Sequence, residues 1–298
     1  MSFRIRRARR SDLAAVSQLT DADRPLLSAA EWKRLPSFLV DGLESGRIQL
    51  CVVEDFRSGK VRFLGGSAFL QDGVRDDILA QPTRSALSLV LERQQTRGTA
   101  LLNRRQIAES NRRGALTLLN FFGTTHGLVA DGASLNAGAS IATETWTFFH
   151  AGFSFREILI ETADRTQAEI LRSIPAQVLR HRADPSGRPA WLFHITREDA
   201  LRNPAGWPFG IMVATPPRFA FTAPQQEVLE LALLDFSDRE MMRELGLTGD
   251  SLKKRWRAIY RRAAVVEPAM FTRSTGADLR RALLQRVRHS LSELRPYR

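Results

Sequence analysis

The sequence has little cysteine, little tyrosine and no long apolar run, and each of these shortages excludes a class of protein. The only cysteine among its 298 residues is Cys51, so internal disulfides and multi-cysteine metal sites are excluded. Cys51 lies in the apolar run IQLCVV and is predicted to be a small core residue of a strand. The sequence contains no run of about 18 apolar residues, the length that spanning a membrane requires. The first arginines are not followed by the apolar segment of a signal peptide. We therefore expect a soluble, cytoplasmic protein without a membrane partner.

Acidic residues are also in deficit. Asp and Glu number 32 against 44 Lys and Arg, which gives a formal net charge of +12. Such a charge favours polyanionic partners. The excess is almost all arginine, however, and a GC-rich genome produces the same bias without any function. Charge alone therefore does not assign a function. A length of 298 residues and a hydrophobic content of 43% predict a globular chain with two domains.

Hydrophobic periodicity predicts an α+β protein, with a mixed α/β domain over residues 1–161. Strands are predicted over 3–6, 48–53, 61–70, 85–92, 115–122 and 153–161. Helices are predicted after a cap at Ser11, over 29–45, over 99–112, and up to His150.

The chain after residue 161 divides into three predicted parts. Residues 162–202 form a small α/β extension, with a helix over 166–173 and a strand over 190–195, whose attachment the sequence leaves open. Six Pro and Gly residues between 203 and 217 predict a linker without regular structure. Residues 218–298 form the last predicted part, which is predicted to be helical throughout from Phe221 on.

Two capping-box spacings and a glycine turn predict a helix-turn-helix at the start of the C-terminal part. Thr222 precedes Gln225, and Ser237 precedes Glu240, each at the spacing in which two side chains satisfy a helix N-terminus. Gly246 then provides a turn, Leu247 plugs the angle between the helices, and Thr248 caps the next helix.

The helix after Thr248 is predicted to be apolar on one side and basic on the other. Leu252, Trp256 and Ile259 fall at i, i+4 and i+7 and form a buried stripe. The basic residues of the opposite side are Lys253, Lys254, Arg257 and Arg261. A charge run by itself is usually a solvated face, but a helix anchored from behind is what insertion into a major groove requires.

Residues 221–262 resemble the DNA-binding domain of LuxR-type transcription regulators, without a gap over about forty positions. The matching segments are FTAPQQEVLEL, SDREMMRELGLT and SLKKRWRAIYRR. Met242 replaces a small alanine where two helices cross, and Arg255 stands where the family often has histidine. The resemblance implies binding of double-stranded DNA. Its implied contact residues are Thr248, Asp250, Ser251, Lys253, Lys254, Arg255, Arg257 and Arg261.

The chain continues beyond this motif with a further amphipathic segment. Its apolar side consists of Leu279, Leu283, Val287, Leu291 and Leu294. This side could pair with a second subunit, giving a homodimer on a two-fold operator, or pack back on its own domain. The sequence favours neither strongly.

A second, weaker resemblance concerns the N-terminal domain. Gln95, Gly98 and Ala100 have the spacing Q-x-x-G-x-A, after a predicted strand and at a predicted helix start, where backbone amides can hold a pyrophosphate. With ALTLLNFF and WTFFHAGFSFREILIE downstream, residues 1–161 resemble the GNAT-type N-acetyltransferase fold. This resemblance makes acyl-CoA the one cofactor to consider.

The shortage of tyrosine bears on whether such a domain catalyses transfer. The family's general-acid tyrosine lies four residues before a Gly-Phe pair, where this chain has Phe148, and both tyrosines lie in the C-terminal part. Phenylalanine cannot return a proton to a thiolate leaving group. His126 and His150 could substitute, but each is expected to be structural. The N-terminal domain is therefore interpreted as a sensor of a small ligand or partner rather than a working enzyme.

Other functional classes lack their signatures. No acidic pair follows the first strand as in a phosphoacceptor receiver, and the N-terminal half has no tyrosine for a lactone-binding pocket. The five histidines show no metal-ligand spacing, and hydrolase and P-loop patterns are missing. The basic start RIRRARR is predicted to be a solvated strand edge. The main hypothesis is a transcription regulator, and the alternative is an acyl-CoA-dependent N-acyltransferase with a nucleic-acid-binding tail.

Overall fold

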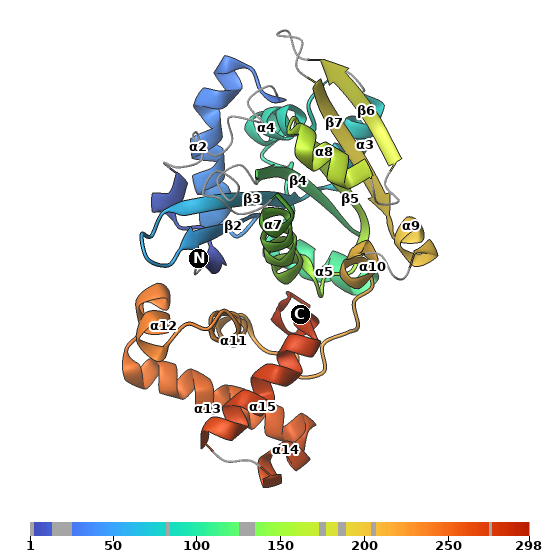
Figure 1. The fold of residues 1–298 in the computed structure, drawn as a ribbon. Coiled ribbons are helices and arrows are strands. Elements are labelled where there is room, and N and C mark those ends of the chain that lie inside the picture. Colours follow the sequence, from blue (N-terminus) through green and yellow to red (C-terminus); the bar gives the residue numbers. More distant parts are fainter. Residues whose placement is uncertain are drawn as a thin grey trace.

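The computed structural model describes most of the chain. It describes residues 3–13, 26–81, 84–124, 135–172, 177–183, 189–203, 207–273 and 276–297. Figure 1 shows a sheet with helices against it and, below it, a separate group of C-terminal helices. We refer to these parts as the sheet domain and the helical domain.

The sheet domain is built on seven strands in the order β1-β2-β3-β4-β5-β7-β6. Their bounds are β1 (Phe3–Arg7), β2 (Ile48–Asp55), β3 (Val61–Phe69), β4 (Leu116–Thr124), β5 (Phe155–Thr162), β6 (Gln177–Ala183) and β7 (Pro189–Thr196). β4 and β5 pair in parallel, and every other neighbouring pair is antiparallel. The predicted mixed α/β domain is therefore present.

Helices cover both faces of this sheet (Figure 1). Their bounds are α2 (Ala29–Glu44), α3 (Asp72–Ala80), α4 (Ala86–Arg97), α5 (Arg104–Arg113), α7 (Leu135–His150), α8 (Arg165–Arg172), α9 (Arg197–Arg202) and α10 (Trp207–Met212), with a 3-10 turn η1 (Arg10–Asp12). α2, α3 and α4 pack on one apolar cluster, and α7, α8 and α10 on another. Central strands buried on both faces read as continuous apolar runs. Cys51 on β2 is 4% exposed, which confirms its predicted core position.

The predicted extension over 162–202 completes the sheet. β7 lies between β5 and β6, so the sheet does not end at residue 161. β6 has no counterpart among the predicted elements. The segment 203–217 also differs from the prediction, because α10 forms within it, and Ile211 and Met212 are both fully buried against the sheet domain. Tertiary burial outweighs the helix-breaking tendency of its Pro and Gly residues.

Two local predictions in the sheet domain were wrong. The run 85–92 forms the start of α4 and not a strand, because all residues from Ala86 to Leu91 are buried, and a run buried all round has no period that distinguishes strand from helix. Ser85 caps this helix by accepting the amide of Ser88. Ser11 does not cap a helix, since it lies inside η1. The helix expected after it falls on residues outside the described ranges.

The helical domain confirms the predicted local elements. Its helices are α11 (Ala223–Leu233), α12 (Asp238–Leu245), α13 (Gly249–Val266), α14 (Pro268–Arg273) and α15 (Gly276–His289), followed by the 3-10 turn η3 (Leu291–Leu294). The Gln225 side chain accepts the Thr222 amide at 2.9 Å, and the Glu240 side chain accepts the Ser237 amide at 2.8 Å. Both capping boxes therefore form as the sequence predicts.

The amphipathic segment at the C-terminus packs back on its own domain. Leu283, Val287 and Leu294 are at most 5% exposed, and Leu279 and Leu291 pack against the same cluster. This settles the use of the apolar side, because it is occupied within the chain. The expected homodimer stays a prediction and needs another surface.

The predicted solvated strand edge is confirmed only in part, because β1 lies at the edge of the sheet with Arg7 exposed, whereas several of the N-terminal arginines are held in ion pairs that join the two domains. Arg6 is buried in ion pairs with Asp12 and Glu54 within the sheet domain. Three other arginines of this segment reach α11 and α12 of the helical domain. The pairs across the domain boundary are Arg4 with Glu240, Arg7 with Glu230 and Arg9 with Glu244. Part of the basic excess is thus neutralised inside the molecule.

Within the described residues, no helix combines the length and apolarity that crossing a membrane requires. The same residues contain no cluster of His, Cys, Asp or Glu arranged to hold a metal ion.

Candidate functional site

The strongest candidate site is the exposed face of α13, which the preceding turn and a buried stripe hold in place. Gly246 adopts φ +62°, a left-handed conformation that favours glycine, and ends α12. Thr248 begins α13 by accepting the Ser251 amide at 3.2 Å. Leu252, Trp256 and Ile259 are 3%, 7% and 0% exposed. The predicted helix, turn and buried stripe are confirmed.

Of the five predicted basic contact residues, four are exposed and Arg255 is half-buried. Lys253, Lys254, Arg257 and Arg261 are exposed on α13. Arg255 is turned back toward α11, where its Nη1 lies 3.2 Å from the Glu227 carboxylate and 3.4 Å from the Pro224 carbonyl oxygen. A guanidinium held by a carboxylate is poorly placed to bind phosphate. The implied phosphate contact of Arg255 is therefore not supported by its position.

The three polar residues at the start of α13 have local roles. The hydroxyl of Thr248 caps the helix and donates to the Ser251 hydroxyl at 3.0 Å. Asp250 is exposed in the first turn, where a negative charge stabilises the helix dipole. All three stand at the exposed helix start, as the sequence predicts for residues near the bases, but no described contact tests such a role.

Met242, the departure from the LuxR-type pattern, lies beside Gly249 without crowding it. A Cβ at Gly249 would lie 3.7 Å from the Met242 sulfur, which is an ordinary contact distance. Met242 is half-buried and packs against the core of the helical domain. The long thioether thus fills the crossing of α12 and α13 without separating them.

The predicted pyrophosphate site is not at a helix start. Gln95 lies in the last turn of α4, and Gly98 is its C-cap with φ +64°. Ala100 is fully buried, and its amide is donated to the Gln94 side chain at 3.1 Å. A helix C-terminus presents carbonyl oxygens and a partial negative charge, which repel phosphate. Gln95, Gly98 and Ala100 therefore do not form the amide cradle that the sequence predicted.

Neither Phe148 nor His150 lies at an open reaction site. Phe148 packs between the two domains, and its carbonyl oxygen accepts a hydrogen bond from Arg295. His150 is 2% exposed, with ring nitrogens 2.7 Å from the Ser67 hydroxyl and 2.7 Å from the Trp146 carbonyl oxygen. Burial lowers the pKa of His150 to about 3, so its ring stays neutral. His150 is structural, as expected, whereas His126 lies outside the described residues.

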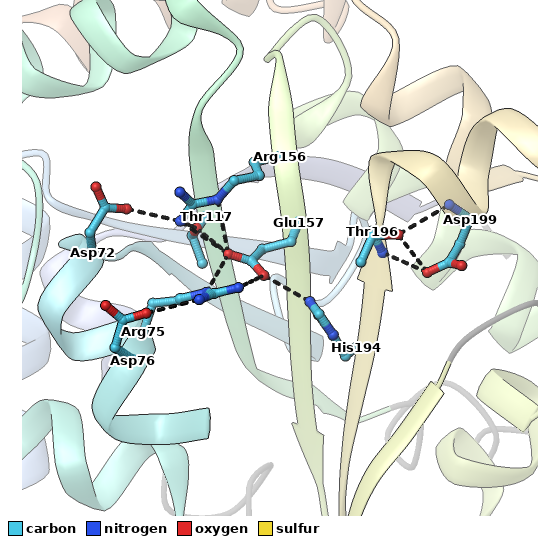
Figure 2. Close-up of polar contacts among 9 residues, drawn as sticks. All are labelled: Asp72, Arg75, Asp76, Thr117, Arg156, Glu157, His194, Thr196 and Asp199. Atoms are coloured by element: carbon cyan, nitrogen blue, oxygen red, sulfur yellow. Dashed lines mark hydrogen bonds and ion pairs between the residues drawn. The ribbon is translucent and has the colours of Figure 1, made fainter. Parts of the chain in front are cut away.

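A buried ionic cluster around Glu157 was not predicted from the sequence (Figure 2). Glu157 on β5 is 2% exposed, and its carboxylate accepts hydrogen bonds from Arg75, Thr117 and Arg156. His194 on β7 holds the other carboxylate oxygen at 2.8 Å. The only sequence signal was a polar residue inside each apolar strand.

The Glu157 cluster fits a structural role. Burial by itself raises the pKa of Glu157, but hydrogen bonds from His194, Arg75 and Thr117 outweigh burial and hold the pKa far below its usual range. Such a carboxylate is a poor general base. The Thr117 hydroxyl donates to Glu157 and not to His194, so the arrangement is not that of a nucleophile with its base. It ties α3, β4, β5 and β7 together (Figure 2).

A second feature of the sheet is the divergence of its two parallel strands. The register of β4 and β5 ends at Asn120 and Ile160. Beyond these residues β4 follows β3 as far as Thr124, and β5 follows β7 as far as Thr162. The facing edges of the two strands are thus not paired with each other past Asn120.

Comparison with known proteins finds only distant likenesses, all of them to solved structures. No family model matches the chain, and no curated protein matches it. Similar solved structures include a ribosomal-protein-S5-alanine acetyltransferase from Vibrio fischeri, with 12% identity, 67% of this chain and 95% of that chain covered, and a TM-score of 0.35. The spermidine/spermine N-acetyltransferase SpeG from Vibrio cholerae is 10% identical, the match covers 67% of this chain and 98% of that one, and the TM-score is 0.34. A GNAT-family acetyltransferase from Streptococcus agalactiae is 11% identical, the match covers 65% of this chain and 95% of that one, and the TM-score is 0.33.

The three neighbours are acetyltransferases by name, and the comparisons give no support to the LuxR-type resemblance or to transcription regulation. Identities and TM-scores of this size are too low to transfer an activity. What the chain does must be argued from its own residues.

Proposed function

We propose that the helical domain binds double-stranded DNA through α13 and that the chain is a transcription regulator. One observation carries this proposal: α13 is buried along Leu252, Trp256 and Ile259, while Lys253, Lys254, Arg257 and Arg261 are exposed. Cations on a helix that is held rigidly can neutralise phosphates in register, and side chains at the helix start can then reach base edges.

The placement of α13 supports the proposal. Figure 1 places α13 on the side of α11 that faces away from the sheet domain. With 18 residues, α13 is about 27 Å long at the usual rise per residue, and a major groove about 12 Å wide admits such a helix. DNA can therefore approach the basic face without displacing the sheet domain.

The test compares two charge reversals of equal size. Lys253→Glu with Lys254→Glu changes the basic face, and Lys33→Glu with Arg105→Glu makes the same change of net charge on exposed residues of α2 and α5. Wild-type protein should enrich one duplex sequence from a random pool. The α13 variant should lose binding at least about tenfold, because two phosphate contacts become repulsive, and the control should keep most of it. Equal binding by both variants would refute the proposal.

A second candidate function rests on the divergence of β4 and β5. Backbone amides and carbonyls on two facing strand edges can hydrogen-bond an extended ligand that itself contains amide groups. The pantetheine arm of an acyl-CoA has this chemistry, so we propose acyl-CoA binding, with acyl transfer to an amine, as the alternative. Titration calorimetry with acetyl-CoA tests binding, and thiol release tests turnover. Absence of heat with acetyl-CoA would exclude this candidate and leave the DNA proposal unchanged.

A further inference from the structure

A cavity of about 280 Å³ lies between the two domains, and none of its lining residues belongs to α13. β1, β2 and α5 contribute its walls from the sheet domain, and α11 contributes from the helical domain. The segment after η3 closes it, through Arg295 and Pro296. The cavity is thus built only when the domains are together.

Positive charge is in excess around this cavity. Its charged lining consists of Arg7, Arg104, Arg295, Glu227 and Glu230, a surplus of one positive charge (3 − 2 = 1). Both carboxylate oxygens of Glu230 are already occupied by Arg7. An anion with one charge would complete the balance.

Two of the arginines have hydrogen-bonding capacity left. Arg104 is exposed and, within the described part of the chain, donates only to the Gln226 side chain, at 3.1 Å. Arg295 is 1% exposed, and its Nη1 lies 3.6 Å from Glu230, too far for a hydrogen bond, with no other described acceptor. Burial lowers the pKa of Arg295 to about 10, and the neighbouring Arg7 adds to this effect although Glu230 opposes it. A buried cationic N–H without an acceptor is unfavourable, and an anionic acceptor would remove that cost.

The remaining walls are apolar. Leu43, Ile48, Ile107, Phe153 and Leu294 line the cavity beside the arginines. A strongly hydrated ion such as phosphate gains nothing from such walls, whereas a hydrocarbon body does. At the volume per molecule of liquid water, 280 Å³ holds roughly nine non-hydrogen atoms.

We propose that this interdomain cavity binds a small organic monocarboxylate, with its carboxylate between Arg104 and Arg295 and its apolar body against Ile107 and Leu294. A planar guanidinium pairs well with a carboxylate, so two arginines suit this role. Binding at this site goes beyond the proposed DNA interface and does not depend on it.

The experiment uses the full chain and benzoate as the probe, in titration calorimetry. Benzoate should bind, and benzamide, which has the same shape without the charge, should bind at least about tenfold more weakly. Arg104→Gln should weaken benzoate at least about tenfold, since it removes one charged donor. Arg105→Gln, on the next residue of α5 and outside the cavity lining, should bind benzoate as the wild type does.

Three results would overturn the proposal. The first is equal affinity for benzoate and benzamide, and the second is equal loss in Arg104→Gln and Arg105→Gln. The third is binding of inorganic phosphate without binding of benzoate, which would assign the surplus charge to an ion and not to a carboxylate with an apolar body. Melting curves of both variants, expected to match the wild type because the two side chains are exposed, separate a binding effect from unfolding.

Discussion

Salt should weaken the proposed DNA complex by an amount that the structure of α13 sets. Four cations, Lys253, Lys254, Arg257 and Arg261, are exposed on α13. If each neutralises one phosphate, the logarithm of the binding constant should fall against the logarithm of salt concentration with a slope of about −3.6. Affinity should then fall by about 150-fold between 50 and 200 mM salt, the range suited to fluorescence anisotropy with a labelled duplex.

Two substitutions that each remove one positive charge should have different effects on this slope. Lys254→Gln removes an exposed cation and should make the slope less steep by about 0.9. Arg255→Gln removes a cation that Glu227 already holds, so the slope should change little. An equal change in both variants would refute the reasoning, because it would mean that Arg255 leaves Glu227 to bind phosphate. A wild-type slope near −1 would refute it as well, since the basic face would then not be the interface.

Three further predictions concern buried side chains. Trp256→Ala should lower the free energy of unfolding by about 3–5 kcal/mol, because it removes a buried side chain. The control Val265→Ala, at a side chain that is 83% exposed, should change it by less than about 0.5 kcal/mol. Equal melting temperatures of the two variants would contradict the buried stripe. Glu157→Gln should cost about 3–5 kcal/mol at pH 7, because the cations around it lose their counter-charge. Since the folded pKa of Glu157 is lowered, the difference from wild type should shrink as the pH falls below about 4.5, and a pH-independent difference in denaturant titrations would contradict this. The pKa of His150 is lowered from 6.5 to about 3, so the free energy of unfolding should fall by about 1.4 kcal/mol for each pH unit below about 6.5. His150→Gln should remove this dependence on pH between pH 6.5 and 5. An unchanged dependence would show that another group titrates in this range.

Elements whose signals are local could be read from the sequence. The caps at Thr222, Ser237 and Thr248 satisfy amides within one turn, so their spacing is sufficient to place three helix starts. The stripe of Leu252, Trp256 and Ile259 follows from helical periodicity alone. For the same reason the basic face of α13 was predictable apart from Arg255, whose partner lies on another helix.

Elements whose signals are non-local could not be read in this way. Residues 86–91 are buried all round, and only their burial among α2, α3 and the sheet makes this run a helix. That error placed Gly98 at a helix start, although it ends a helix. The Glu157 cluster joins residues that are 82, 40 and 37 positions apart along the chain, a separation at which no sequence pattern pairs them.

The sequence by itself determined strands β2 and β3, the caps, the glycine turn and the amphipathic stripes, because each depends on neighbours within a few residues. Only the tertiary structure decided which charges remain free. Arg4, Arg7 and Arg9 are bound to glutamates of the helical domain, and Arg255 is bound to Glu227, while Arg104 and Arg295 meet at a cavity. An ion pair forms where the fold brings two opposite charges together. The sequence gives the net charge of +12, but only folding decides which of these cations are exposed on α13 and which line the interdomain cavity.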